Sequence, residues 1–371
     1  MQEEYNSLIK NKTWKLVELP PGKNVVKSKW IFKTKRNSDG EIVRYKARLV
    51  AKGYTQRFGI EYDETYAPVV RYTSIRFLMS LAVQQGLKIH QMDAVTAFLQ
   101  GDLNEEIYLE QPKCFENGTK QVCKLQKAMY GLKQAGRQWN CKLDDALKRF
   151  GFKNCQMDPC IYYTGNLMLI IAIYVDDFLS FYKQTEQLEN IKELLSKNFK
   201  MKDMEQTRSC IGIRINQSEN SIKLDQQAYT EEILKRFGMA DCKTIGTPSN
   251  LLTKMSTNMD AEEMEHDVPY QQAVGSLLYL AQGTRPDISY AVNTASKFNT
   301  SYTASHWKAV KRIFRYLKGT INYKLCYFQG NSNELKGYSD SDWASNEDDR
   351  RSCTGYVFMM SNAAISWKST R

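Results

Sequence analysis

Two adjacent aspartates, Asp176 and Asp177, interrupt the most apolar part of the chain. An apolar run at residues 167–175 precedes them and a second run at 178–181 follows, which predicts a buried hairpin with both carboxylates at its tip. A third aspartate, Asp93, ends a shorter predicted strand at residues 87–92. Three such carboxylates could hold two Mg²⁺ ions, or Mn²⁺ in their place, and so support phosphoryl transfer.

A pair of adjacent aspartates is more often a solvated turn than a metal site. Two details of this pair favour the metal site. Its flanks are apolar on both sides, where carboxylates without a cation would destabilise the fold. The pair also stands within the tetrapeptide Tyr-Val-Asp-Asp at residues 174–177, with the strand-ending Asp93 upstream.

Positive charge is concentrated before these aspartates. The chain of 371 residues has a net charge of +11, and residues 23–57 contain eleven basic residues against two acidic ones. Such a basic segment suits a polyanionic partner such as nucleic acid. After a predicted turn at 37–40, basic and apolar residues alternate as in a strand. That strand would present Arg44, Lys46 and Arg48 on one face and pack Tyr45, Ala47 and Leu49 inward.

The elements that must position these residues are short strands and amphipathic helices. Apolar residues at helical spacing predict helices at 73–85 and 138–150, and another after the Asp-Asp hairpin. A second hairpin is expected at 210–224, with its turn at 218–220. The stretch 226–317 reads as mainly helical, and short strands return from residue 335.

The remaining composition excludes several other classes of protein. Nine cysteines without a CxxC pair and three histidines predict reduced thiols in an intracellular protein and offer no zinc site. The polar N-terminal residues are unlike a signal peptide. The longest apolar run, at 167–175, is too short to span a bilayer, so we expect no membrane association.

The Tyr-Val-Asp-Asp tetrapeptide resembles the active-site signature of retroviral-type reverse transcriptases. Further blocks resemble the reverse transcriptase region of the Pol polyprotein of copia-type LTR retrotransposons, and they follow in order along almost the whole chain. These blocks lie at residues 29–33, 45–53, 65–69, 91–99, 130–135, 158–160, 284–292 and 315–320.

The resemblance implies a role for each candidate site residue. Asp93, Asp176 and Asp177 would hold two Mg²⁺ ions. Lys46 and Arg48 would bind the incoming triphosphate through charge-assisted hydrogen bonds, although a solvated strand face is the alternative. Phe98 would be the bulky gate that excludes a ribose 2′-hydroxyl, and core packing is a compatible role. Gln134 would contact the nucleotide or template. Residues 210–213 would form a hairpin that supports the primer end, with a plain core hairpin as the alternative.

The same resemblance implies the architecture, an α+β fold. A right-hand polymerase with fingers, palm and thumb would be followed by an incomplete RNase H-like α/β segment, with Asp340 as its first metal ligand. Because the sequence ends before the other ligands of that site, we expect no RNase H activity. The expected domains are an N-terminal extension at 1–22, fingers and palm at 23–225, a mainly helical thumb or connection at 226–333, and the RNase H-like fragment at 334–371.

The function implied is RNA-directed DNA polymerisation, in which a primer 3′-hydroxyl attacks a deoxynucleoside triphosphate. The expected partners are an RNA template, a DNA primer–template duplex, dNTPs, and other Pol or capsid products of the element. The expected location is the cytoplasm, in a virus-like particle for an intact element, with the nucleus as an alternative. A different reading is an inactive or domesticated remnant that only binds nucleic acid. A two-metal nuclease lacks the further acidic cluster it would need.

Overall fold

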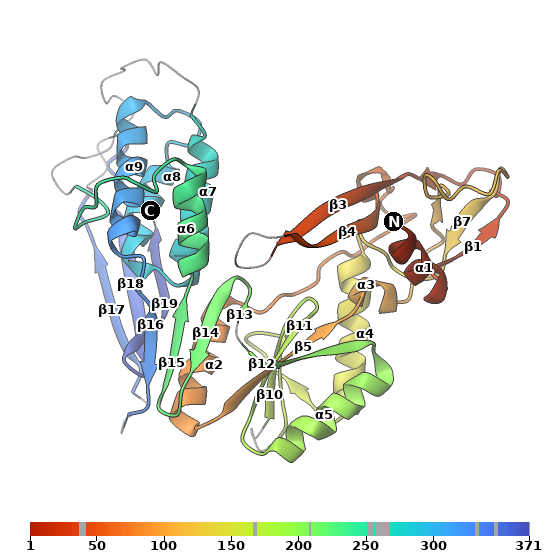
Figure 1. The fold of residues 1–371 in the computed structure, drawn as a ribbon, viewed down its shortest axis with the longest axis horizontal. Coiled ribbons are helices and arrows are strands. Elements are labelled where there is room, and N and C mark those ends of the chain that lie inside the picture. Colours follow the sequence, from red (N-terminus) through yellow and green to blue (C-terminus); the bar gives the residue numbers. More distant parts are fainter. Residues whose placement is uncertain are drawn as a thin grey trace. The chain divides into compact units, whose positions relative to one another are not determined.

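The structure, a computed structural model, describes residues 1–36, 42–165, 169–207, 209–250, 256, 268–330, 334–344 and 348–370. The chain divides into two compact units. Unit 1 comprises Met1–Val70 and Gln91–Glu205, and unit 2 comprises Arg71–His90 and Gln206–Arg371. Both units mix helices with strands (Figure 1), which agrees with the predicted α+β class.

The N-terminal part of unit 1 forms a four-stranded sheet and a two-stranded ribbon. The sheet has the order β1-β7-β6-β2. The ribbon is the antiparallel pair of β3 and β4 (Figure 1). In this pair, Trp30 lies opposite Leu49. Leu8, Leu49 and Leu109 help to join the helix, ribbon and sheet in one apolar core. The elements are α1 (Gln2–Lys10), β1 (Trp14–Val17), β2 (Val25–Val26), β3 (Ser28–Arg36), β4 (Ile42–Ala51), η1 (Gly53–Thr55), β6 (Tyr108–Leu109) and β7 (Val122–Leu125).

A six-stranded sheet carries the second core of unit 1. Its order is β12-β5-β11-β10-β9-β8. Alternate residues of β10, among them Ile171 and Ile173, pack with Trp139 of α4 and Leu195 of α5, so both helices cover the same face. The elements are β5 (Lys88–Ala94), α3 (Ala97–Gln100), α4 (Ala135–Arg149), β8 (Lys153–Asn154), β9 (Ile161–Tyr163), β10 (Leu169–Tyr174), β11 (Asp177–Tyr182), α5 (Thr185–Asn198) and β12 (Met201–Gln206).

Unit 2 combines two sheets with helices. The first sheet has the order β13-β14-β15-β16 and the second β17-β18-β19. Apolar residues of α6 to α9, such as Leu277 and Phe314, form its helical core. The elements are α2 (Tyr72–Gln85), β13 (Ser209–Cys210), β14 (Ile213–Gln217), β15 (Ser221–Asp225), α6 (Gln227–Arg236), α7 (Tyr270–Gly283), η2 (Pro286–Ile288), α8 (Ser289–Ser296), α9 (Ala304–Gly319), β16 (Leu325–Phe328), β17 (Lys336–Ser341), β18 (Thr354–Met360) and β19 (Ala363–Thr370).

One buried cation ties β19 to the helices of unit 2. Arg76 of α2 is 3% exposed and donates to the carbonyl oxygens of Gln282 at 2.7 Å, Gly283 at 2.9 Å and Ile365 at 2.8 Å. Its guanidinium also lies 3.8 Å from the ring centroid of Trp367. Burial lowers the pKa of Arg76 to about 10, so the side chain remains charged at neutral pH.

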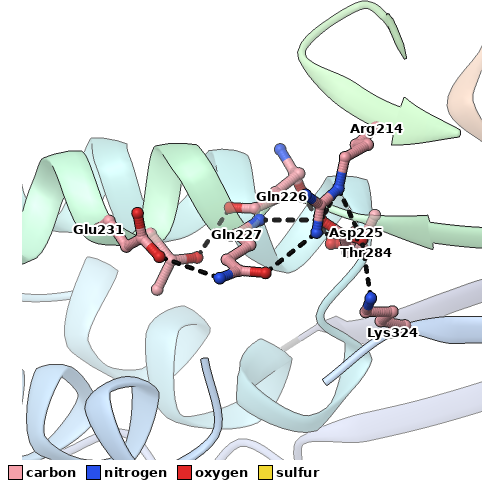
Figure 2. A network of polar contacts seen from close by, with 8 residues as sticks. Arg214, Asp225, Gln226, Gln227, Glu231, Thr284 and Lys324 are labelled. Atoms are coloured by element: carbon pink, nitrogen blue, oxygen red, sulfur yellow. Dashed lines mark hydrogen bonds and ion pairs between the residues drawn. The ribbon is translucent and has the colours of Figure 1, made fainter. Parts of the chain in front are cut away.

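A second polar network joins three elements of unit 2 around the 1% exposed Asp225 (Figure 2). Arg214 donates to both carboxylate oxygens, with Nε 3.0 Å from Oδ1 and Nη2 3.0 Å from Oδ2. Lys324 Nζ lies 3.6 Å from Oδ2. The Gln227 backbone N–H donates to Oδ1 at 3.2 Å. The carboxylate therefore accepts a hydrogen bond from the first residue of α6 and pairs with two cations, which is a structural role.

The predicted elements are confirmed where apolar periodicity was strong. The helices at 73–85 and 138–150 correspond to α2 and α4, and the second hairpin corresponds to β14 and β15. Its turn closes through a hydrogen bond from Ser218 N–H to the Ser221 carbonyl, 2.8 Å. The predicted turn at 37–40 lies outside the described residues. No helix within the described ranges has the length and apolar character needed to cross a bilayer.

The inward packing predicted for Tyr45 is wrong. Its side chain is 74% exposed, as is much of Phe32 on the partner strand. The β3–β4 ribbon has two strands, and its base, at Leu49 and Ala51, belongs to the apolar core, with Trp30 packed against it. Period-two alternation predicts which residues share a strand face, but it cannot show whether another layer covers that face.

Candidate active site

The two adjacent aspartates lie at the tip of the β10–β11 hairpin. Tyr174 and Asp177 form the last residue pair of the antiparallel ladder, so Asp176 lies in the turn. Val175 in the same turn has a φ of +58°, a conformation that β-branched residues rarely adopt. Its carbonyl oxygen accepts a 2.7 Å hydrogen bond from the indole Nε1–H of Trp139 in α4. The buried indole thus holds the turn that presents the carboxylates.

Asp93 joins them from the neighbouring strand β5. The backbone N–H of Ala94 donates to the carbonyl oxygen of Asp176 at 2.8 Å. The Gln91 side-chain Nε2 donates to Asp177 Oδ1 at 2.9 Å. These two hydrogen bonds fix the end of β5 to the hairpin tip, and they bring together the three predicted carboxylates.

Burial and mutual repulsion shape the electrostatics of this cluster. Burial raises the pKa of Asp93, the charges of Asp176 and Asp177 raise it further, and Lys202 and Lys46 oppose the rise. Burial also raises the pKa of Asp177, with Asp176 adding to the shift and the Gln91 hydrogen bond opposing it. A divalent cation would offset this repulsion. The carboxylate oxygens are also the kind of ligand that Mg²⁺ prefers.

The three carboxylates are near one another without forming a complete metal cage. Within the described ranges, no group of three or more His, Cys, Asp or Glu side chains is arranged to hold a metal ion. Mg²⁺ sites in phosphoryl-transfer enzymes commonly take only one or two protein carboxylates and complete their octahedron with water and substrate phosphate.

The basic strand β4 reaches the same region. Lys46 acts electrostatically on Asp93, and Arg48 places its guanidinium 4.5 Å from the ring centroid of Tyr130. Both side chains are half-buried. Arg44, farther along the strand, is exposed and pairs with Glu3 of α1 at 2.6 Å. Of the predicted cationic face, Lys46 therefore acts on the carboxylates directly, and Arg48 contacts Tyr130.

The first helix brings a second carboxylate to this strand. Glu4 lies in the electrostatic field of Arg48 and Lys46 and near the backbone N–H of Leu49. Burial raises the pKa of Glu4, and these three interactions oppose the rise. The cations proposed to bind phosphate thus already have an anionic neighbour within the chain.

Phe98 lies in α3, a few residues after Asp93. Its half-buried ring packs against both cores of unit 1. The ring centroid lies 4.9 Å from that of Tyr130, at an interplanar angle of 58°. This position is compatible with core packing and with a gate beside the nucleotide sugar.

Among the described residues, Gln134 makes its hydrogen bonds away from the carboxylates. It is fully buried, and its amide Nε2 donates to the Glu61 carbonyl at 2.8 Å. Its Oε1 accepts a 3.0 Å hydrogen bond from Gln56. The amide is engaged inside unit 1, so a contact with nucleotide or template would require these bonds to break and stays a prediction.

The remaining candidates lie in unit 2. Asp340 is an exposed residue of β17, opposite Gly355 of β18. In the predicted primer-supporting hairpin, Cys210 pairs with Ile213, and the Ile211 carbonyl accepts a 2.8 Å hydrogen bond from the Tyr279 hydroxyl. The roles given to both remain predictions.

The sequence interpretation missed three residues of the site. Gln91 lies two positions before Asp93 on the same strand, so period-two reasoning could have found it. Trp139 was assigned only to the apolar face of its helix. Tyr130 begins the block at 130–135, but its role could not be predicted, because its partners Arg48 and Phe98 come from distant segments.

Comparison with known proteins defines the class. The chain belongs to the reverse transcriptase (RNA-dependent DNA polymerase) family, whose model matches residues 11–251. Over its full length it is 47% identical to the retrovirus-related Pol polyprotein from transposon TNT 1-94 of Nicotiana tabacum, across 381 residues. Against the corresponding polyproteins from transposons RE1 and RE2 of Arabidopsis thaliana, the identity is 41% and 40% over 376 residues.

The chain spans 29% of the tobacco polyprotein and 26% of each Arabidopsis polyprotein. These similarities confirm the resemblance to copia-type Pol polyproteins that the sequence blocks indicated.

Proposed function

We propose that the chain is an RNA-directed DNA polymerase that extends a primer 3′-hydroxyl with deoxynucleoside triphosphates. One observation carries the proposal: in a chain of the reverse transcriptase family, the Ala94–Asp176 and Gln91–Asp177 hydrogen bonds gather three carboxylates beside a basic strand. Carboxylates and cations in this arrangement suit the binding of a metal-complexed triphosphate.

Each residue group has a distinct task in the proposed reaction. Asp93, Asp176 and Asp177 would hold two Mg²⁺ ions, or Mn²⁺, which when bound neutralise charge on the attacking and leaving oxygens. Lys46 and Arg48 would bind the triphosphate and orient it. Phe98 would pack beside the sugar and exclude a ribose 2′-hydroxyl. Holding nucleotide and primer in one geometry supplies much of the rate enhancement in phosphoryl transfer.

The proposed architecture follows from the same assignment. The fingers would include the β3–β4 ribbon, the palm the six-stranded sheet, and the thumb or connection helices α6 to α9. Strands β17 to β19, with Asp340, would begin an RNase H-like segment. In the structure, residues 1–22 contribute α1 and β1 to unit 1, and Arg71–His90 belongs to unit 2.

The proposed partners are an RNA template, a DNA primer–template duplex, dNTPs and other products of the same element. Binding to nucleic acid would rest mainly on phosphates, with little sequence specificity and strong dependence on salt. The proposed location is the cytoplasm.

Primer extension tests the function directly. Incorporation on a poly(rA)·oligo(dT) template with Mg²⁺ or Mn²⁺ is expected, and EDTA should abolish it. The double variant Asp176→Asn, Asp177→Asn should show none, while Asp145→Asn, at an exposed aspartate of α4, should match the unchanged chain.

Absence of incorporation by the unchanged chain would reject the polymerase. If salt-sensitive binding to the primer–template persisted in that case, the chain would be a remnant that only binds nucleic acid.

A further inference from the structure

Tyr130 links two of the residues proposed to contact the incoming nucleotide. The Arg48 guanidinium carbon lies 4.5 Å from the centroid of its ring, within the range of a cation–π interaction. The Phe98 ring lies 4.9 Å away in a tilted arrangement that aromatic pairs favour. One half-buried ring thus contacts both a cation of β4 and the proposed sugar gate of α3.

The hydroxyl of Tyr130 is also within the electrostatic field of the carboxylates. Burial raises its pKa, Arg48 opposes the rise, and the charges of Asp176, Glu4 and Asp93 add to it. The ring therefore belongs to the candidate active site, although no sequence motif assigns it a role there.

The backbone fixes Tyr130 relative to the basic strand. The N–H of Ala51, three residues after Arg48, donates to the Tyr130 carbonyl at 2.8 Å. The next residue, Gly131, has a φ of +93°, and a Cβ there would overlap the Ala51 carbonyl oxygen. This close approach of two backbones leaves the ring little freedom to move away from β4.

Phe98 is fixed from the other direction. Its helix α3 follows β5, whose Ala94 N–H is bonded to the Asp176 carbonyl, and the adjacent Leu99 is buried in the core. Phe98 therefore follows closely after the strand that holds Asp93, and its ring contacts Tyr130, which in turn contacts Arg48.

We propose that Tyr130 is a positioning residue that couples phosphate binding by Arg48 to sugar discrimination by Phe98. The inference rests on the proposed polymerase function. An apolar pocket rejects one added hydroxyl only weakly. Stronger rejection requires a side chain that cannot move aside to make room for the hydroxyl. Tyr130 supplies that rigidity, because it supports the Phe98 ring while its own position is set by Ala51 and Gly131.

The test is single-nucleotide extension on an RNA template whose next base is U, with dATP and ATP as the substrates. Tyr130→Leu should raise the KM for dATP about three- to tenfold, because the cation–π and aromatic contacts are lost. The ratio of kcat/KM for dATP to that for ATP should fall roughly tenfold, with kcat for dATP little changed. Tyr130→Phe keeps the ring and should preserve both the KM and the ratio.

A matched control separates positioning from general loss of packing. Phe115 in unit 1 also contacts two rings, those of Tyr5 at 4.2 Å and Trp30 at 5.8 Å. Phe115→Leu should lower thermal stability without changing the dATP/ATP ratio. If Tyr130→Leu fails to fold, Tyr130→Met, which retains an unbranched apolar side chain, replaces it.

A double-mutant cycle completes the test. The effects of Arg48→Gln and of the Tyr130 variant on the dATP KM should not add, because both remove the same contact. An unchanged KM and ratio in Tyr130→Leu, or an equal fall in the ratio for Phe115→Leu, would overturn the inference while leaving the polymerase intact. Lack of incorporation by the unchanged chain would overturn the polymerase itself, and this inference with it.

Discussion

Val175 adopts an unfavourable backbone conformation directly before the two aspartates, and a buried indole holds it there. Asp93 and Asp177 likewise depend on their neighbours, since Ala94 and Gln91 supply the hydrogen bonds that gather them. At the scale of single residues, the site is therefore an arrangement that the surrounding fold imposes on groups that repel one another. Strain of this kind is typical of functional sites.

Asp93→Asn is expected to stabilise the metal-free chain while abolishing incorporation. An acid whose pKa is higher in the folded state binds more protons when folded. The free energy of unfolding therefore falls as the pH rises from the unfolded-state pKa to the folded-state pKa. Ionised Asp93 therefore opposes folding at neutral pH. The melting temperature of the variant should be higher by roughly 1–3 °C, the size of a modest substitution effect.

Thermal melts in EDTA check this prediction. The difference in melting temperature between Asp93→Asn and the unchanged chain should shrink as the pH is lowered toward the ordinary aspartate pKa of about 3.9. At that pH the folded chain's Asp93 is also protonated. Asp145→Asn, on the exposed side of α4, serves as the control and should have no such effect. A lower melting temperature for Asp93→Asn at neutral pH would contradict the electrostatic account.

At the scale of elements, the close approach of two backbones matters more than any single side chain. The end of β4 and the segment at Tyr130 are joined by the Ala51 hydrogen bond, and Gly131 permits that approach. The arrangement holds Tyr130 beside the basic strand, where both Arg48 and Phe98 contact its ring.

Gly131→Ala should lower the free energy of unfolding by about 2–4 kcal/mol, from backbone strain and steric overlap together. Gly118 is the matched control, since its φ is +77° but a Cβ there meets nothing within 4 Å. Gly118→Ala should cost only about 1 kcal/mol, the strain of the left-handed conformation alone. Urea unfolding of both variants provides the comparison, and equal losses would show that the close approach is not the cause.

The elements also show how far sequence reasoning reached. The β10–β11 hairpin could be predicted because apolar runs on both sides of Asp176 and Asp177 leave few alternatives. The burial of Gln134 could not, because its hydrogen-bond partner Gln56 and the Glu61 carbonyl lie far away in the chain. Tyr45 failed for a related reason: alternation does not show whether a second layer covers the strand.

At the scale of the whole molecule, each unit joins segments that lie far apart in the sequence. Arg71–His90, which carries α2, belongs to unit 2 although it lies between two segments of unit 1. Arg76 shows why, since it binds carbonyl oxygens from α7 and β19, more than 200 residues later. Such long-range pairing leaves no periodic signal in the sequence.

Arg76→Lys should destabilise unit 2 by about 2–3 kcal/mol, because an ammonium cannot serve three carbonyl oxygens and stack on Trp367 at the same time. Hydrogen exchange should accelerate in β19 and at the end of α7. The amides of β10 and β11 in unit 1 serve as the internal reference. Unchanged protection in β19 would show that Arg76 does not hold that strand.

Helix α1 brings the carboxylate of Glu4 close to the basic strand β4. Glu4 lies beside the two cations proposed to receive the triphosphate, so docking of the helix and binding of nucleotide become linked equilibria with opposing signs. Glu4→Gln should then lower the KM for dNTPs about two- to fivefold, unlike Glu18→Gln at an exposed position. A higher KM would instead mean that Glu4 orients Arg48. If the first outcome holds, the first helix is an internal competitor of the substrate, and saturating nucleotide should make Gln2–Lys10 more sensitive to proteases.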